Sequence, residues 1–115
     1  PWKFILVHEP GWSAGPHENN EVVQKIIHPI AARYGVAIVF SGHNHYYARA
    51  VVDGVNYLTT GGGGSELYDP EYYWPNIQKT IKAYHYLRVE IKGGLLTVTV
   101  LSPSGEKLDQ FELNQ

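Results

Sequence analysis

The chain has 115 residues, of which 43% are hydrophobic, and a net charge of −2 with histidine counted as neutral. This length fits a single domain with a real core, and the small charge gives no electrostatic reason to expect nucleic acid as a partner. Cysteine is absent, so disulfides and thiolate ligands are excluded and any metal must be held by nitrogen and oxygen atoms.

Two apolar runs of strand length stand in the first third of the chain, at residues 3–7 (KFILV) and 36–40 (VAIVF). Uninterrupted apolar runs are typical of strands that are covered on both faces. A loop rich in Gly and Pro at 8–19 and a helix separate the two runs. Strand, helix, strand is a βαβ unit, which makes the two strands parallel members of one sheet.

The helix between these strands is expected to begin after Asn19 or Asn20, because either side chain can cap it. Apolar residues then recur at helical spacing. Pro29 is expected to break or kink the helix near His28, because proline cannot donate the backbone hydrogen bond of a helix interior. A second short helix should end at Gly35.

The pattern then becomes antiparallel. Asp53-Gly54 is a hairpin signal between strand-like residues 47–52 and 55–60, and a loop of glycines and aromatic residues follows at 61–75. Beyond a polar bridge, three alternating segments are expected to form antiparallel strands with one wet side: 84–91, 95–101 and 107–113. The fold class is therefore α/β, a βαβ unit followed by an antiparallel meander.

The first residues suggest a fragment. The chain opens within a strand and contains no methionine, and two parallel strands alone make a poor sheet. We therefore expect residues 1–115 to be part of a longer protein.

Three histidines lie at or just beyond the ends of the two apolar strands. His8 follows the first strand, and His43 and His45 follow the second. Because the carboxyl ends of parallel strands lie on one edge of a sheet, where ligands gather in open α/β folds, the three imidazoles should converge there.

The two histidines of Gly-His-Asn-His are two positions apart. If the backbone is extended, about 6.6 Å separates them, which suits two ions roughly 3.5 to 4 Å apart, each bound by one ring. Asn44 between them should point away from the ions. A His-x-His pair is by itself a weak signal, and the histidines could be incidental.

The whole chain resembles the C-terminal half of the calcineurin-like metallophosphoesterases, in their purple-acid-phosphatase-like branch. The resemblance runs from "FILVHEP" through "YGVAIVFSGHNHYYAR" to "VNYLTTGGGG" and the closing strands. The Gly-His-x-His motif of the family is met by residues 42–45, and its preceding single histidine by His8. The resemblance implies one half of a metallophosphoesterase-type αββα sandwich, with residues 1–115 as the C-terminal part of the domain.

The resemblance also implies an activity, the hydrolysis of phosphate esters, phosphomonoesters in particular, by a dinuclear metal centre. His8 and His43 would share one ion and His45 would bind the other. The ions would be two divalent or trivalent metals, with Fe, Zn and Mn all compatible with nitrogen and oxygen ligands. The aspartate and asparagine motifs of the family, including the bridging aspartate, do not occur in this chain. We therefore expect a missing N-terminal half as its partner, and no activity from this chain alone.

Two further residues are candidates for the substrate. By the same resemblance, His17 could contact the phosphate or protonate the leaving group, since an imidazole titrates near neutrality; otherwise it is an exposed loop histidine. Arg49 could reach a substrate phosphate, or it could form a charge pair that supports the Gly-His-Asn-His segment at 42–45 (the metal loop). We favour the supporting role. His28 is expected to be a surface or kink residue, and His85 to be structural.

The aromatic residues of two loops leave two alternatives open. They could wall a substrate pocket or cover apolar surface that faces the missing half; they are Trp12, Tyr68, Tyr72, Tyr73 and Trp74. The glycines at 61–64 are not a phosphate-binding P-loop, because no Gly-Lys-Ser/Thr follows. We expect them to let the backbone pass close to the metal rim, or to give the next loop mobility.

An alternative function is a non-catalytic module that binds carbohydrate or protein partners through its aromatic loops. No apolar run approaches the roughly 18 residues of a membrane span, so a membrane is not expected as a partner. Unpaired strand edges could drive self-association of the fragment. The metals, the substrate, the compartment and the oligomeric state stay open.

Overall fold

A computed structural model describes residues 1–71 and 74–115. Tyr72 and Tyr73 of the aromatic loop lie outside the described residues. The elements follow in the order β1 (Phe4–Leu6), the π-helical turn η1 (Val23–Ile27), α1 (His28–Arg33), β2 (Ile38–Ser41), β3 (Tyr47–Val52), β4 (Val55–Thr60), β5 (Ile77–Ile81), β6 (Tyr86–Lys92), β7 (Leu95–Leu101) and β8 (Lys107–Asn114).

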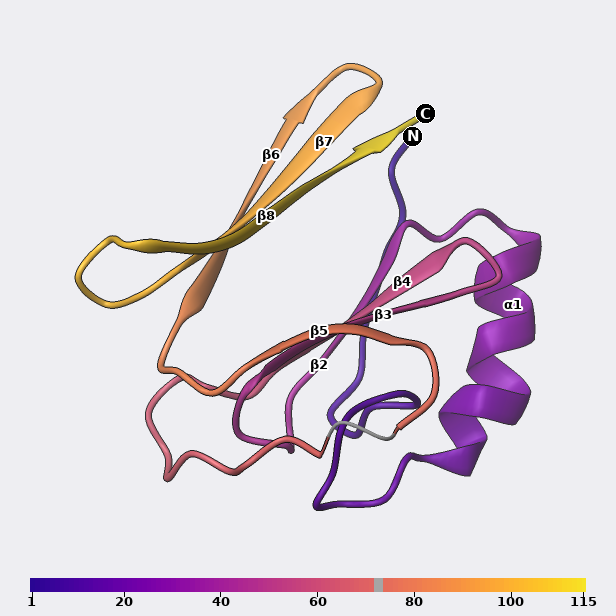
Figure 1. The fold of residues 1–115 in the computed structure, drawn as a ribbon. Coiled ribbons are helices and arrows are strands. Elements are labelled where there is room, and N and C mark those ends of the chain that lie inside the picture. Colours follow the sequence, from indigo (N-terminus) through magenta and orange to yellow (C-terminus); the bar gives the residue numbers. More distant parts are fainter. Residues whose placement is uncertain (72–73) are drawn as a thin grey trace.

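The first sheet has the strand order β1-β2-β4-β3-β5 (Figure 1). The two apolar strands are parallel neighbours as predicted, with Phe4 opposite Ile38 and Leu6 opposite Phe40. β4 is also parallel to β2, and β3 pairs antiparallel with both β4 and β5. β5 was not predicted, because its middle residues 78–80 are polar and it is a short strand at the edge of the sheet.

The second sheet is the predicted meander, β6-β7-β8, and it packs on one face of the first sheet (Figure 1). Apolar side chains from both sheets share one core cluster: Ile38, Tyr47, Leu58, Leu96, Val98 and Val100. The helical segment covers the opposite face of the first sheet, where Val23 and Ala31 pack with Val39 and Tyr57. The chain is therefore a mixed α/β structure of a helical layer and two sheets, and the predicted fold class is confirmed.

The helical segment begins and ends at the predicted signals. The Asn20 side chain accepts a hydrogen bond from the Val23 N–H at 3.0 Å and so caps the segment. The π-helical turn η1 runs directly into α1, so the helical segment continues through Pro29, and the break expected near His28 is only a change from π-helical to α-helical geometry. Gly35 follows the helix end with a φ of +68°, the left-handed conformation that glycine adopts without strain. No helix of the described residues is long and apolar enough to cross a membrane.

Two apolar surfaces lack cover among the described residues. β1 was expected to be buried on both faces, but it is an edge strand, and Leu6 is 77% exposed. On the helix, Val22, Ile26 and Ile30 recur every four residues and are each more than half exposed. The prediction for β1 was wrong because an apolar run indicates only that burial of the strand is favourable, and not that residues of this chain pack on both of its faces.

Candidate metal centre

Parallel pairing carries the first candidate histidine to the metal loop. Beyond the formal end of β1, the Val7 N–H donates to the Phe40 carbonyl oxygen at 3.0 Å. The Gly42 N–H then donates to the His8 carbonyl oxygen, also at 3.0 Å. The backbone of His8 is thus held beside the start of the Gly-His-Asn-His segment, at the carboxyl edge of the sheet.

The rings of His8 and His43 meet at this edge. Nε2 of His8 lies 3.1 Å from Nδ1 of His43, and the ring centroids are 4.9 Å apart. Two ligand nitrogens that each lie about 2.1 Å from one ion, at angles between a right angle and tetrahedral, are roughly 3.0 to 3.4 Å apart. The spacing therefore fits two ligands of a single ion, and it also fits an N–H···N hydrogen bond in which one ring donates.

The metal loop is a tight turn and not the extended segment that the spacing argument assumed. His43 has a φ of +67°, in the left-handed region that side chains rarely adopt, and the Asn44 N–H donates to the Gly42 carbonyl oxygen at 2.7 Å. The separation derived for an extended backbone therefore does not apply here. The turn directs the two histidines of the motif to different neighbours.

His45 contacts the aromatic loop. Its Nδ1 lies 2.7 Å from the Glu66 carbonyl oxygen, and its ring stacks on Tyr68 with centroids 4.1 Å apart. A carbonyl oxygen can only accept, so Nδ1 carries the proton and Nε2 keeps its lone pair for a ligand. Among the described residues, no hydrogen bond or ring contact joins His45 to His8 or His43.

His17 joins the cluster from the loop after β1. Its ring stacks on the His43 ring with centroids 3.9 Å apart and an interplanar angle of 27°, and it makes a T-shaped contact with Tyr68. The side chain predicted as a substrate contact therefore lies directly on one of the predicted ligands, and Tyr68 forms a wall shared by His17 and His45.

The pKa of His43 is lowered by partial burial and by the positive charge that protonated His17, His8 and His45 would carry, while Glu9 acts in the opposite direction. The Glu9 carboxylate lies 3.8 Å from His43 Nε2. A lowered pKa favours the neutral imidazole, which is the form that binds a metal.

These residues fit part of a metal site. Among the residues that the structure describes, no group of three or more histidine or carboxylate side chains could hold an ion by itself. Because an ion with nitrogen and oxygen ligands needs four or more of them, the pair of His8 and His43 is an incomplete ligand set.

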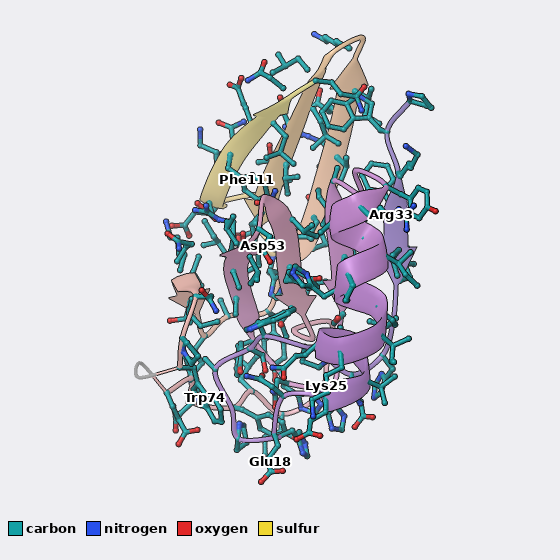
Figure 2. All side chains as sticks on the ribbon, turned by 90° about the vertical axis from the view of Figure 1, so that its right-hand side faces the viewer. Glu18, Lys25, Arg33, Asp53, Trp74 and Phe111 are labelled. Atoms are coloured by element: carbon teal, nitrogen blue, oxygen red, sulfur yellow. The ribbon has the colours of Figure 1, made fainter. Side chains whose placement is uncertain are left out.

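Arg49 lies elsewhere. Its Nε is 3.4 Å from the Asp109 carboxylate, and its guanidinium stacks 4.8 Å from the centre of the Phe111 ring, between the two sheets. Figure 2 shows Phe111 far from Glu18, the neighbour of His17 in sequence. Arg49 therefore forms a charge pair, the kind of role favoured from the sequence, but its partner is Asp109 between the sheets, a buried carboxylate that sequence reasoning missed. A contact of Arg49 with a substrate phosphate stays a prediction.

Asp109 is the centre of this charge cluster. It accepts a hydrogen bond from the Tyr47 hydroxyl at 2.9 Å and lies 3.4 Å from Lys79 Nζ. Burial alone would raise the pKa of Asp109, but the hydrogen bond from Tyr47 and the charges of Arg49 and Lys79 outweigh it, so the pKa lies below its usual value.

Two other histidines have structural surroundings. His28 contacts the Tyr57 hydroxyl at 2.6 Å and Asp53 at 2.7 Å. Both ring nitrogens of His85 are also engaged, at 2.8 Å each, by the Thr60 hydroxyl and the Ala83 carbonyl oxygen.

The described aromatic residues divide between the core and the cluster. Trp12 packs on His28 and Tyr57, so it faces the core under the helix and not the histidine cluster. Tyr68 contacts His17 and His45. Trp74 packs against the small core cluster of Ala14, Tyr46 and Ala48.

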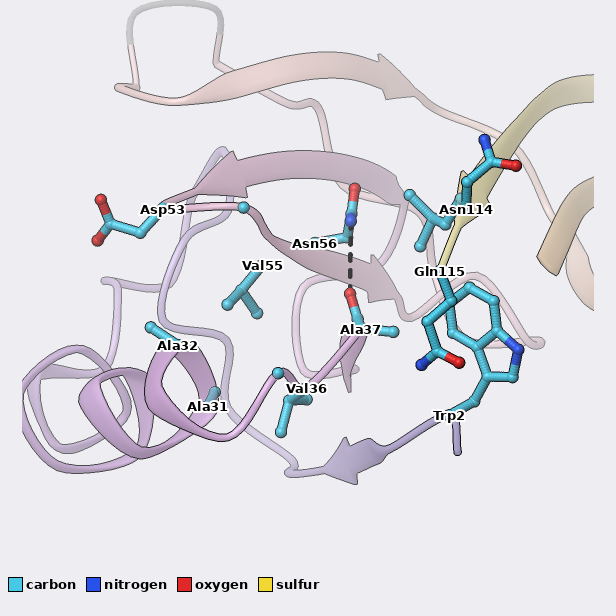
Figure 3. Close-up of a pocket in the computed structure, with 13 residues that line it drawn as sticks. Trp2, Ala31, Ala32, Val36, Ala37, Asp53, Val55, Asn56, Asn114 and Gln115 are labelled. Atoms are coloured by element: carbon cyan, nitrogen blue, oxygen red, sulfur yellow. Dashed lines mark hydrogen bonds between the residues drawn. The ribbon is translucent and has the colours of Figure 1, made fainter. Parts of the chain in front are cut away.

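A pocket of about 270 Å³ opens at the opposite edge of the sheet (Figure 3). It lies between the helix end, both chain termini and the amino ends of β2 and β4, where the Asn56 side chain donates to the Ala37 carbonyl oxygen. The histidines follow the carboxyl ends of the strands, so this pocket is separate from the candidate metal centre.

Comparison with known proteins supplies a family context. No family model matches the chain. It is 27% identical over 123 residues to tartrate-resistant acid phosphatase type 5 of Oryctolagus cuniculus, covering 96% of this chain and 37% of that enzyme. It is 38% identical over 52 residues to purple acid phosphatase 1 of Ipomoea batatas, covering 44% of this chain and 11% of that enzyme. The chain thus spans little more than a third of the first of these relatives.

Solved structures share the fold. GAP50, the anchor in the inner membrane complex of Plasmodium, superposes with a TM-score of 0.84 at 18% identity, over 96% of this chain and 36% of GAP50. Purple acid phosphatase PPD1 from seeds of yellow lupin (Lupinus luteus) gives a TM-score of 0.79 at 19% identity, over 99% of this chain and 25% of that protein. The resemblance to the purple-acid-phosphatase-like branch, inferred from the motifs, is confirmed.

Proposed function

We propose that this chain supplies the histidine-rich half of a dinuclear metal centre that hydrolyses phosphate esters, phosphomonoesters in particular. The observation that carries the proposal is the 3.1 Å approach of His8 Nε2 to His43 Nδ1 at the carboxyl edge of a parallel sheet. The purple acid phosphatases among the relatives support a hydrolase of this kind.

In this proposal His8 and His43 bind one ion, and His45 binds the other through Nε2. The hydrogen bond from His45 Nδ1 to the Glu66 carbonyl oxygen supports this role, because such bonds orient ligand rings and select their tautomer. The ions would neutralise the negative charge that develops on the phosphoryl oxygens. Fe, Zn and Mn all accept nitrogen and oxygen ligands.

His17 would act on the substrate and not on the ions. Its ring lies against His43, so a phosphate bound at the centre would come within reach of a ring nitrogen of His17. As a positioned imidazole, it would donate a hydrogen bond to a phosphoryl oxygen or a proton to the leaving oxygen. The remaining ligands, including a bridging carboxylate, would come from a preceding part of the same domain, and residues 1–115 alone would be inactive.

The test is turnover of p-nitrophenyl phosphate together with elemental analysis, on the full-length protein that contains this chain. His8→Ala, His43→Ala and His45→Ala are expected to lower metal content and to reduce turnover by at least about 100-fold. His28→Gln is the matched control, because the His28 ring binds Tyr57 and Asp53 and lies outside the histidine cluster. This variant should keep the metal content and the turnover of the wild type. Unchanged metal content and turnover in the three alanine variants would end the proposal.

A second candidate is a non-catalytic module. Two observations favour it: the superposition on GAP50, described as an anchor, and a pocket of about 590 Å³ beside the glycine loop with Tyr84 and Tyr86 in its lining. Exposed tyrosines suit a carbohydrate or protein partner. Full-length protein that is folded but holds no metal and has no turnover would favour this candidate.

A further inference from the structure

The residue between the two motif histidines has a role of its own. The Asn44 side chain is fully buried, with 0% exposure, and it points into the loop at 13–17. What it points toward is the backbone of His17.

The amide of Asn44 pairs with both polar backbone groups of His17. Asn44 Oδ1 accepts from the His17 N–H at 3.1 Å, and Nδ2 donates to the His17 carbonyl oxygen at 3.3 Å. Nδ2 also donates to the Ser13 hydroxyl at 2.8 Å. A backbone N–H can only donate and a carbonyl can only accept, so these partners determine which end of the amide is oxygen.

Tyr46 holds the same loop one step earlier. Its hydroxyl accepts from the Ala14 N–H at 2.8 Å and donates to the Gly15 carbonyl oxygen. Tyr46 and Ala14 are both fully buried. The side chains of Asn44 and Tyr46, two positions apart, therefore both bind the backbone of the loop that carries His17.

The consequence is the position of the His17 ring. The His17 ring stacks on His43, and Asn44 is the next residue after His43 in the chain. The bonds from Asn44 to the His17 backbone therefore hold His17 beside the ring on which it stacks. The loop around His17 is otherwise exposed at residues 16–18 and has no strand or helix of its own. Asn44 makes the two hydrogen bonds described for the backbone of His17 itself, so without it the His17 ring would lose this direct restraint.

We propose that Asn44 is a positioning residue that holds His17 over His43, at the side of the centre where a phosphate ester would bind. The catalytic value of this arrangement rests on the proposed function, but the arrangement itself does not. The two are therefore tested by separate measurements.

The first measurement is NMR of the full-length protein with selectively labelled histidine, recorded without metal or substrate. Stacking places the His43 ring protons in the ring current of His17, so His17→Ala defines their unstacked position. Asn44→Ala is expected to move these signals to that position. Asn56→Ala is the matched control, another buried asparagine that donates to a backbone carbonyl but lies at the opposite edge of the sheet, and it should leave them unmoved.

The second measurement is a double-mutant cycle on kcat/KM with p-nitrophenyl phosphate. Asn44→Ala is expected to lower kcat/KM by roughly 10- to 100-fold through misplacement of His17. In the His17→Ala background the same change should have no further effect.

Every outcome of these two measurements either supports or overturns the proposal. His43 signals that stay at the wild-type position in Asn44→Ala, or a loss of kcat/KM that is as large in the His17→Ala background, would overturn the proposal. If Asn44→Ala does not fold, Asn44→Asp is judged by the same two criteria, because its carboxylate can accept from the His17 N–H but cannot donate to the His17 carbonyl. A protein without turnover removes the proposed function alone, since the NMR result still decides whether Asn44 holds His17.

Discussion

Nε2 of His8 lies 3.1 Å from Nδ1 of His43, although 35 positions separate the two residues in the chain. Their contact follows from the parallel pairing of β1 and β2, which places the residue after one strand beside the residues after the other. The proposed function gives the histidines different roles, and experiments can distinguish these roles.

The metal stoichiometry should divide the histidines into two groups. Under the proposed function, His8→Ala and His43→Ala each remove the same ion, while His45→Ala removes the other. A His8/His43 double variant should therefore hold as much metal as either single variant, and a His43/His45 double variant should hold less. Elemental analysis of the full-length protein measures this, and equal metal loss in both double variants contradicts the assignment.

The four consecutive glycines should differ sharply in their tolerance of alanine. A Cβ at Gly61 would overlap the Asn44 carbonyl oxygen, and one at Gly62 would lie 2.5 Å from His85 Nδ1 and 2.7 Å from the Ala83 carbonyl oxygen. Gly63 and Gly64 have open space at the same position. Gly61→Ala and Gly62→Ala should each destabilise the protein by about 1 to 3 kcal/mol.

Gly63→Ala and Gly64→Ala are the matched controls and should change stability by less than about 0.5 kcal/mol. Urea denaturation of the four variants measures the difference. Equal effects at all four positions would show that the glycines provide loop mobility and not the close approach of the backbone.

Asp109 should make the free energy of unfolding decrease as the solution becomes acidic. Its pKa is lower in the folded state than in the unfolded chain, so the unfolded chain binds more protons in this range. The stabilisation is complete above the unfolded pKa, near 4, and is lost as the pH falls through the folded pKa. The urea denaturation midpoint is measured at pH 6 and at successively lower pH below 4. It should fall more steeply with decreasing pH for the wild type than for Asp109→Asn.

At neutral pH, Asp109→Asn should destabilise the protein by about 2 to 3 kcal/mol, because Arg49 and Lys79 lose a buried partner while keeping some access to solvent. Glu90→Gln is the control, since Glu90 forms an exposed pair with Arg88. Matching pH profiles for the wild type and Asp109→Asn would remove Asp109 as the source of the dependence.

Residues 1–115 on their own are expected to self-associate. Leu6 on the edge strand β1 and Val22, Ile26 and Ile30 on the helix leave apolar surface without cover among the described residues. Leu6→Lys and Ile26→Lys should reduce association in sedimentation velocity, while Lys25→Gln, at an exposed helix position, should not. A monomer at every concentration contradicts this prediction.

Local patterns determined much of the fold. The hairpin turn at Asp53-Gly54 has φ values of +48° and +77°, as its residue types predicted, because few residues other than Asn, Asp and Gly adopt that turn. The strands at 47–52, 55–60 and 95–101 have the predicted bounds. β5 escaped prediction because an edge strand with polar middle residues has no strong pattern of its own.

The chemistry of the site was only partly local. The order of His8 and the Gly-His-Asn-His segment predicted that His8 and His43 meet, because parallel strands end on one edge. His45, which was expected to join them, stacks on Tyr68 instead. The sequence could not show that His43 adopts a left-handed backbone, that Asn44 grips the backbone of His17, or that Arg49 turns to Asp109 between the sheets. Residue types and spacing along one strand set the first kind of feature, whereas the second depends on which distant segments the packed sheets bring within hydrogen-bond distance.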